Sequence, residues 1–126
     1  MNISVYYEDT DATGIVYHPN YLKFCDRARS NYFFSTGTPV GKQNGHLIIH
    51  SLQCQYIAPA KLGDQLFIES KILKLKKTSI ELEQNIYLDE KVIFKLQIKM
   101  LYVVDMKPYI FSEEMIRLFD SILKDK

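Results

Sequence analysis

A regular alternation of apolar and polar side chains restricts the fold of this chain more than any other feature of its sequence. Between Val92 and Val104 every second residue is apolar, in the order Val92, Phe94, Leu96, Ile98, Met100, Tyr102, Val104. Successive side chains of a β-strand point to opposite faces, so the pattern predicts one long strand with a single buried face. Such a strand needs neighbouring strands and a second layer that covers its apolar face.

Three less regular alternations precede this strand and predict a sheet. They cover residues 46–60, where Pro59 interrupts the pattern, then 66–72 and 80–88. The turn signals between them are Gly63-Asp64, Lys76-Lys77-Thr78 and Asp89-Glu90-Lys91. Short polar runs of this kind favour tight reversals, so we expect four long strands joined as antiparallel hairpins.

The N-terminal region predicts a short strand, a loop and one long helix. We expect the strand over residues 3–7 and the loop over 8–17. Pro19 suits the first turn of a helix and Gly37 supplies a stop signal, so the helix covers about 17 residues. Its apolar positions are Tyr21, Cys25, Ala28 and Tyr32, widened by Leu22, Phe24, Phe33 and Phe34. A stripe this wide is typical of a helix buried on most sides, so we expect the sheet to wrap around it.

A second, shorter helix is expected near the C-terminus. Ser112 followed by Glu113 and Glu114 has the pattern of an N-cap and an acidic first turn. The apolar positions that follow are Met115, Ile116, Phe119, Ile122 and Leu123. Helices segregated from an antiparallel sheet define an α+β fold, and 126 residues suit one domain spanning 1–126.

Composition and charge argue against several classes of protein. Apolar residues make up 47% of the chain, and 16 Lys and Arg balance 15 Asp and Glu, which does not favour a disordered or nucleic-acid-binding protein. No leader pattern is visible and no apolar run approaches the roughly 20 residues that span a bilayer, so we expect a cytoplasmic protein. Cys25 falls in the helical stripe and Cys54 in a strand, which favours buried, reduced thiols over a disulfide.

The loop ahead of the long helix carries several acid and base groups. Asp9, Asp11 and His18 lie close in sequence around Gly14, and turns held by a rigid scaffold often carry function. Composition alone explains Asp11 better by an Asx-turn or a helix cap. It also explains His18 better by local hydrogen bonding than by catalysis.

Two other kinds of catalytic site are not supported by the sequence. His46 and His50 would share one face of a helix, but in a strand they lie about 13 Å apart, too far to bind one ion. We therefore expect no metal. A G-x-S-x-G motif is missing from the sequence, which disfavours a serine hydrolase of the α/β type.

Residues 6–21 match a specific signature. They read Y-Y-E-D-T-D-A-T-G-I-V-Y-H-P-N-Y, which closely resembles the loop Y-x-D-T-D-x-x-G-x-V-Y-H/Y-x-x-Y of hotdog-fold acyl-CoA thioesterases. The similar branch contains 4-hydroxybenzoyl-CoA thioesterase and the YbgC-type, Tol-Pal-associated enzymes. Residues 55–64 resemble the family's Y-x-A-P-A-x-x-x-D segment, and Met106-Lys107-Pro108 resembles its C-terminal part. The similarity covers nearly the whole chain and implies about five strands curled around a central helix.

The resemblance implies roles for three residues of the signature. Asp11 matches the catalytic carboxylate, acting either as a nucleophile that forms a mixed anhydride or as the base that activates water. His18 matches a position held by His or Tyr, where it hydrogen-bonds the thioester, positions water or assists the leaving thiol. Tyr7 matches the signature Tyr and orients the carboxylate or acyl group, although an aromatic strand residue filling the core is the alternative.

Other residues of the loop are expected to shape the site. Gly14 gives the backbone freedom to approach a ligand, and Val16 and Tyr17 are expected beside the substrate. Asp9 is assigned to the geometry of the turn. The resemblance does not specify which backbone amide stabilises the oxyanion.

Three lysines cluster at one predicted hairpin. Lys74, Lys76 and Lys77 are most simply explained as solvated turn residues. The hydroxybenzoyl-type enzymes carry arginines in the similar segment, near the phosphates of coenzyme A. The resemblance therefore implies that these lysines attract the same anion.

The resulting hypothesis is an acyl-CoA thioesterase that releases a free carboxylic acid and coenzyme A without metal or organic cofactor. The resemblance implies a dimer or tetramer with active sites between subunits, and the wide apolar surfaces also favour association. One alternative is an acyl-acyl-carrier-protein thioesterase, in which the lysines dock an acidic protein. The other is a non-catalytic acyl-binding or scaffolding module. The length and type of the acyl chain stay open.

Overall fold

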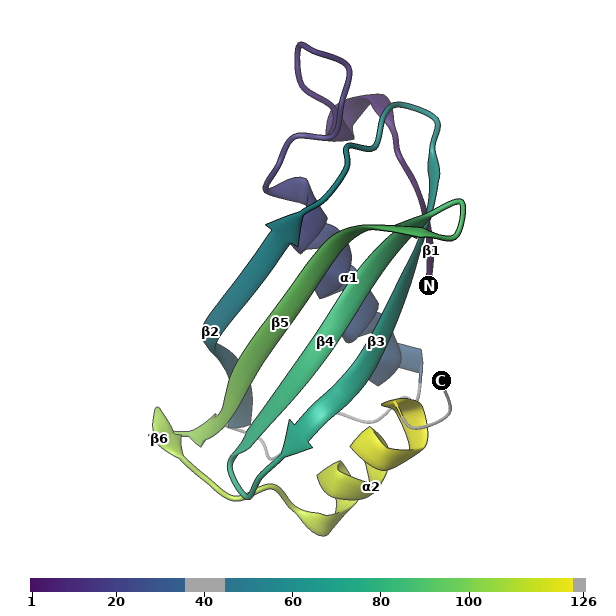
Figure 1. Ribbon diagram of the computed structural model, residues 1–126. Helices are drawn as coiled ribbons and strands as arrows, with labels where there is room; N and C mark the ends of the chain where they lie inside the picture. The colour runs from purple at the N-terminus through teal and green to yellow at the C-terminus, as the bar shows by residue number, and fades with distance from the viewer. Residues whose placement is uncertain (36–44, 124–126) are drawn as a thin grey trace.

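The computed structural model describes residues 1–35 and 45–123, with side chains described for 1–31 and 45–120. The elements are β1 (Asn2–Ser4), a 3₁₀ turn (Tyr7–Asp9), α1 (Asn20–Ser35), β2 (Gly45–Tyr56), β3 (Gln65–Leu75), β4 (Ser79–Leu88), β5 (Lys91–Val104), β6 (Lys107–Pro108) and α2 (Glu113–Leu123). All four long strands expected from the alternation are present, and the sheet curls around α1 (Figure 1). The expected hotdog fold is confirmed.

The strand order differs from a simple meander. It is β1-β3-β4-β5-β2, with antiparallel neighbours and β6 added to β5. The hairpins β3–β4 and β4–β5 form as expected, but the hairpin expected across Gly63-Asp64 is wrong, because β2 pairs with β5 and β3 pairs with β1. The Gly63 N–H donates to the Val5 carbonyl (3.0 Å) and the Val5 N–H donates to the Asp64 carbonyl (2.9 Å). This turn is therefore fixed to the N-terminal segment, and the chain crosses from one edge of the sheet to the other.

The turn between β4 and β5 is shorter than its three-residue sequence signal. Asp89 and Glu90 occupy the left-handed region, at φ 49° and 71°, and Lys91 already belongs to β5. Two successive left-handed residues match the right-handed twist of the flanking strands. Neither residue is glycine, so both conformations carry a steric cost that the long β4–β5 ladder offsets.

The core lies between the inner face of the sheet and α1. The five central apolar residues of the β5 alternation, from Phe94 to Tyr102, are all at most 5% exposed. The helix contributes Tyr21, Phe24, Cys25 and Ala28 to the same core, which confirms that part of the stripe. The expected side chains of Tyr32, Phe33 and Phe34, and the stop signal at Gly37, lie outside the described part of the chain.

The first strand is shorter than the alternation predicted. β1 ends at Ser4, and Tyr7 begins a 3₁₀ turn instead of continuing a strand over residues 3–7. The Asp9 carboxylate causes this, because its Oδ2 accepts the Tyr6 N–H (2.9 Å) while the Asp9 N–H donates to the Tyr6 carbonyl (3.0 Å). The Tyr6 N–H thus donates to a nearby side chain and not to a neighbouring strand of the sheet.

The C-terminal helix follows the predicted cap. Ser112 Oγ accepts the N–H of Met115 (3.2 Å), and Met115 and Phe119 are buried. Phe111 stacks on Tyr102 (5.6 Å between ring centroids) and meets Phe119 edge-on (5.3 Å). Helix α2 therefore covers the end of the sheet opposite the loop that precedes α1 (Figure 1). The side chains of Ile122 and Leu123 are outside the described set.

Strand β2 forms an open edge of the sheet. It pairs with β5 on one side, and most of its residues are exposed, including the apolar side chains of Ile49, Leu52 and Tyr56. A long edge strand with unpaired backbone groups and apolar side chains is a template for another strand. Among the described helices, none is long and apolar enough to cross a membrane.

Candidate active site

The turn from Tyr6 to His18 is fixed to the start of α1 by Asp9. The Asp9 carbonyl accepts the Tyr17 N–H and the Asn20 side-chain amide, both at 2.9 Å. Its carboxylate is buried and bonds to the Tyr6 N–H, as described above. One residue thus joins the beginning of the turn to the beginning of the helix. The geometric role expected for Asp9 agrees with this position.

Asp11 begins a tight loop within this turn. Its N–H donates to the Ile15 carbonyl (2.9 Å), and its carbonyl accepts the Gly14 N–H (3.0 Å). Thr10 and Val16 form an isolated antiparallel bridge that closes the loop. Gly14 has a φ of 83°, a conformation that glycine adopts without steric cost. The loop therefore reverses at Gly14 and presents Asp11 to solvent.

The Asp11 carboxylate is held in its charged form by Thr13. Its Oδ1 accepts the Thr13 hydroxyl (2.6 Å) and the Thr13 N–H (2.8 Å), forming an Asx-turn. These two bonds are the main reason that the pKa of Asp11 lies below its usual value, and the charge on His18 lowers the pKa further. The other oxygen, Oδ2, accepts no hydrogen bond from the described residues. The structural and catalytic interpretations of Asp11 are compatible, because each uses a different oxygen.

His18 lies in a group of aromatic rings at the start of α1. Its ring is exposed and meets Tyr17 edge-on (5.0 Å between centroids) and Tyr56 at 6.3 Å. The Tyr56 hydroxyl donates to the His18 carbonyl (2.9 Å). Tyr56 also contacts Phe94 (5.0 Å), so the end of β2 positions the backbone of His18 against the sheet.

The structure separates the remaining signature residues. Tyr7 is 82% exposed on the 3₁₀ turn, so the alternative that it fills the core is wrong. Among the described residues no hydrogen bond joins its hydroxyl to Asp11. Val16 is buried, and its N–H donates to the Ala60 carbonyl (2.9 Å), so Val16 supports the loop from behind. Tyr17 is half exposed beside His18 and is available to a ligand.

The three lysines are not near Asp11 within one chain. Lys74, Lys76 and Lys77 are exposed at the β3–β4 hairpin, next to α2 and at the opposite end of the sheet from the turn (Figure 1). Strand β3 has 11 residues, so the two ends are on the order of 30 Å apart. The two groups therefore do not form one compact site within a single chain.

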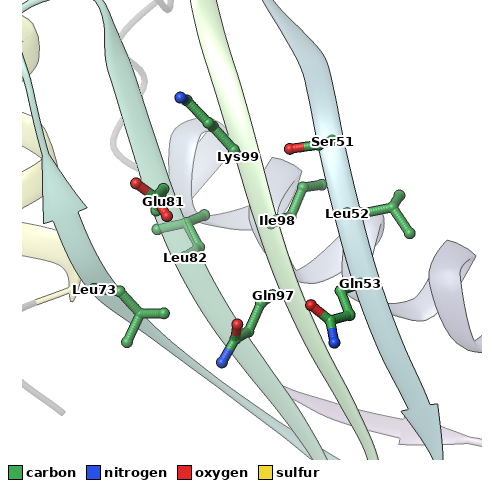
Figure 2. Close-up of a pocket in the computed structure, with 9 residues that line it drawn as sticks. All are labelled: Ser51, Leu52, Gln53, Leu73, Glu81, Leu82, Gln97, Ile98 and Lys99. Atoms are coloured by element: carbon green, nitrogen blue, oxygen red, sulfur yellow. The ribbon is translucent and has the colours of Figure 1, made fainter.

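A shallow hollow on the outer face of the sheet is separate from this site. It encloses about 220 Å³, and Figure 2 shows its side chains on β2, β3, β4 and β5, with α1 behind the sheet. Polar groups such as Gln53, Glu81, Gln97 and Lys99 line it. It contains none of the signature residues, so its chemistry does not bear on Asp11.

Several residues at the site were missed by the sequence interpretation. Thr13, which fixes the Asp11 carboxylate, was not singled out, and Tyr56, which binds the His18 carbonyl, was noted only as part of the 55–64 segment. A hydroxyl residue two positions after Asp11 is the local signal for an Asx-turn. Tyr56 gives no such signal, because its contact with His18 depends on the curvature of the sheet. His46 and His50 lie on β2 as expected, and the described residues contain no cluster of three potential metal ligands.

Comparisons with known proteins agree with this geometry. Residues 13–94 match the sequence profile of the Thioesterase superfamily. The chain belongs to this family. The match begins two residues after Asp11, so the family assignment does not depend on the carboxylate.

Two relatives are of the expected YbgC type. The Acyl-CoA thioesterase YbgC of Haemophilus influenzae is 35% identical, over 95% of this chain and 93% of that protein. The Acyl-CoA thioesterase YbgC of Helicobacter pylori is 45% identical over 69% of this chain, and the match spans 65% of that relative's length. A crystal structure of a hypothetical protein from Aquifex aeolicus superposes with a TM-score of 0.88 at 21% identity, over 94% of this chain and 97% of that one. The expected thioesterase family is confirmed.

Proposed function

We propose that this protein is an acyl-CoA thioesterase in which Asp11 carries the chemistry. The observation that supports this most is the charged, exposed carboxylate of Asp11, fixed through one oxygen with the other open to solvent. Membership of the Thioesterase superfamily supplies the reaction type. The reaction takes an acyl-CoA thioester and water and releases a carboxylic acid and coenzyme A, within one domain formed by residues 1–126.

Two routes use the open oxygen of Asp11. As a nucleophile, it adds to the thioester carbonyl, the C–S bond breaks, and the coenzyme A thiolate leaves and takes a proton. Water then cleaves the resulting anhydride and restores the carboxylate. As a base, Asp11 accepts a proton from water while that water attacks the same carbon. In both routes His18, at the edge of the same turn, donates a hydrogen bond to the reacting group or the departing sulfur.

An amide at the start of α1 stabilises the negative oxygen of the intermediate. The Tyr17 N–H donates to Asp9 and the Asn20 N–H donates to the Tyr17 carbonyl. The His18 N–H, in contrast, has no acceptor among the described residues. It lies just before α1, at the positive end of the helix dipole and on the same turn as Asp11, so we assign it as the oxyanion donor.

The complete site forms between two copies of the chain. The β2 edges of two copies pair antiparallel, with the two-fold axis at the middle of the strand. This pairing places the Tyr56 end of one copy beside the Gly45 end of the other. Gly45 pairs with Val104, and Ser79 pairs with Leu101, so the lysine hairpin is at the Gly45 end of the sheet. Lys74, Lys76 and Lys77 of one copy then approach a substrate bound at Asp11 of the other. Two such dimers form the proposed tetramer.

An acyl-acyl-carrier-protein thioesterase remains the second candidate. The lysine hairpin that suits coenzyme A phosphates also suits an acidic carrier protein. Both substrates place the reaction in the cytoplasm. A non-catalytic scaffolding module is less well supported, because Asp11 keeps an open, charged oxygen that binding alone does not need.

One assay separates these candidates. Purified protein is supplied with a panel of acyl-CoA thioesters and with acyl-carrier-protein thioesters, and free thiol is measured over time. We expect turnover of acyl-CoA, and we expect Asp11→Asn to remove most of it. Turnover of carrier-protein thioesters alone would favour the second candidate, and no turnover of either substrate would favour the scaffolding module.

A further inference from the structure

Arg29 on α1 carries a positive charge that is buried between the helix and the sheet. It is 8% exposed, and its Nη1 donates to Gln84 Oε1 (2.7 Å). Charged side chains are rarely buried without a full ionic partner. The only carboxylate in contact with Arg29 in the described residues is Asp26, which is exposed and 3.4 Å from Nη2. Arg29 is therefore mainly bound to a neutral amide.

The position of Arg29 is fixed by a second layer of hydrogen bonds. Gln84 is completely buried on β4, and its Nε2 donates to the Cys25 carbonyl and to Ser70 Oγ, both at 3.0 Å. These bonds fix which end of the amide faces Arg29. An apolar residue would fill this position at a lower cost in free energy than a buried charge does. A positioned and buried guanidinium instead suggests a ligand.

Arg29 lines a groove between α1 and β2. The groove encloses about 420 Å³, a size that suits a small-molecule site. Leu47, Ile49 and Met100 form its apolar wall, and Asp26 and Ser30 flank the guanidinium. Gly45 also lines the groove, and a side chain at this position would collide with the ring of Tyr102.

Arg29 has binding capacity left for a ligand. A guanidinium carries five N–H donors in a planar fork that matches a carboxylate through two parallel bonds. In the described structure two contacts use part of this capacity, the bond to Gln84 and the longer contact to Asp26. A groove that combines such a fork with an aliphatic wall suits a chain that ends in a carboxylate.

We propose that this groove binds the acyl part of the substrate, and that Arg29 selects acyl chains with a second carboxylate at their far end. This inference rests on the proposed thioesterase activity and on the β2-paired dimer. In that dimer the Gly45 end of one copy, which carries the groove, adjoins the His18 and Asp11 end of the other. The thioester then lies at Asp11 of one subunit, and the chain extends towards Arg29 of its partner.

The test compares acyl-CoA pairs that differ only in the terminal carboxylate. These are hexanoyl and adipoyl, octanoyl and suberoyl, and decanoyl and sebacoyl thioesters. We expect wild type to have a higher kcat/KM for the dicarboxylic member of at least one pair. Arg29→Met should lower that preference about tenfold or more, mainly through KM. Lys71→Met, which removes an exposed cation paired with Glu83 on the outer face, is the matched control and should leave the preference unchanged.

Two further variants keep the test decisive if Arg29→Met is unstable. Arg29→Lys keeps the charge without the fork and should give an intermediate preference. Asp26→Asn removes the competing carboxylate and should raise the preference. Equal or lower kcat/KM for the dicarboxylic members in wild type, or a preference that the Arg29 and Asp26 variants do not change, would overturn the inference. Hydrolysis of neither member would instead contradict the proposed function.

Discussion

The turn from Tyr6 to His18 and the hairpin from Leu75 to Ser79 lie at opposite ends of one sheet and are built in opposite ways (Figure 1). In the turn, hydrogen bonds through Asp9 and Thr13 fix the backbone and the Asp11 carboxylate. In the hairpin the backbone is also held, since the Lys76 N–H donates to the Ser79 carbonyl (2.9 Å) and the Lys77 carbonyl accepts the Phe111 N–H (2.8 Å). The side chains of Lys76 and Lys77, in contrast, are exposed and form no hydrogen bond among the described residues. Bond-making chemistry needs a fixed group, whereas attraction of a phosphate needs only charge at the right distance.

The difference also shows what one chain lacks. The turn contains the carboxylate proposed to react, and one basic residue, Lys61, pairs with its Ile15, but the lysine cluster is at the other end of the sheet. The hairpin contains cations without a reactive group. The open edge of β2 is the element that can join the two ends, because its pairing is antiparallel and reverses one copy relative to the other.

The largest expected effect comes from the Asp11 carboxylate, in the turn from Tyr6 to His18. Asp11→Asn keeps the Asx-turn to Thr13 but removes the charge, so kcat should fall by about 10² to 10⁴. The thermal midpoint should stay close to that of wild type, because the side chain is exposed. Thiol release under saturating acyl-CoA and a thermal melt measure the two quantities. Turnover near the wild-type rate would rule out Asp11 as the reacting group.

The second effect concerns the open edge. Leu52→Lys places a charge on the exposed apolar side of β2, where the partner is expected to pack, so the protein should become monomeric. Activity should fall by roughly tenfold or more, since each site then lacks its second subunit. Sedimentation velocity at micromolar concentration detects the change. Lys91→Glu, a charge change at the first residue of β5, serves as the control. A monomer with full activity would place the whole site in one chain.

The third effect distinguishes the two aspartates of the signature. Asp9→Ala removes the acceptor of the Tyr6 N–H and leaves that donor unpaired, so the free energy of unfolding should fall by about 1–3 kcal/mol. Asp11→Ala should leave it nearly unchanged. Urea denaturation of both variants gives the comparison. Equal destabilisation by both would contradict the separate roles of the two carboxylates.

The fourth effect is at the lysine hairpin. Replacing Lys74, Lys76 and Lys77 by Ala should raise KM for acyl-CoA roughly fivefold and reduce its dependence on salt. The KM for a truncated acyl-pantetheine thioester, which lacks the nucleotide, should not change. If both substrates respond equally, the lysines do not contact the nucleotide. If only a carrier-protein substrate is affected, the hairpin docks a protein.

The smallest effect is a shift in pH dependence. Thr13 lowers the pKa of Asp11, so the carboxylate stays charged down to a pH below the usual aspartate range, and kcat should fall only at more acidic pH. Thr13→Val removes the hydroxyl bond, which is the largest cause of that shift. In Thr13→Val the pKa of Asp11 should rise, so the acidic side of the pH profile of kcat should move to higher pH. An unchanged profile would mean that another group controls it.

Local pattern was sufficient to predict the four long strands and the two helices. The alternation from Val92 to Val104 and the stripe from Tyr21 to Ala28 gave the long strand and the helix, because burial on one face sets their periods. The local pattern did not predict that β2 pairs with β5. That pairing depends on a crossover between distant edges, which no local turn signal encodes.

The site was predicted in part, and the omissions have physical reasons. The motif located Asp11 and His18 on the same turn, but the exposure of Tyr7 follows from the Asp9 bond that ends β1. Arg29 was given no role, although it lies four residues after Cys25 and eight after Tyr21, within the apolar stripe itself. A charged residue at a core position of a helix is a signal that the sequence interpretation did not use.

The most direct test of the account is a subunit-mixing experiment. Asp11→Asn chains and chains with Lys74, Lys76 and Lys77 replaced by Ala are combined with different affinity tags, and the mixed oligomer is purified. If each site takes Asp11 from one subunit and the lysines from the other, one kind of site in the mixture is intact. The mixed protein should then show part of the wild-type kcat with the wild-type KM for acyl-CoA. A KM as high as that of the lysine variant alone would contradict a site shared between subunits.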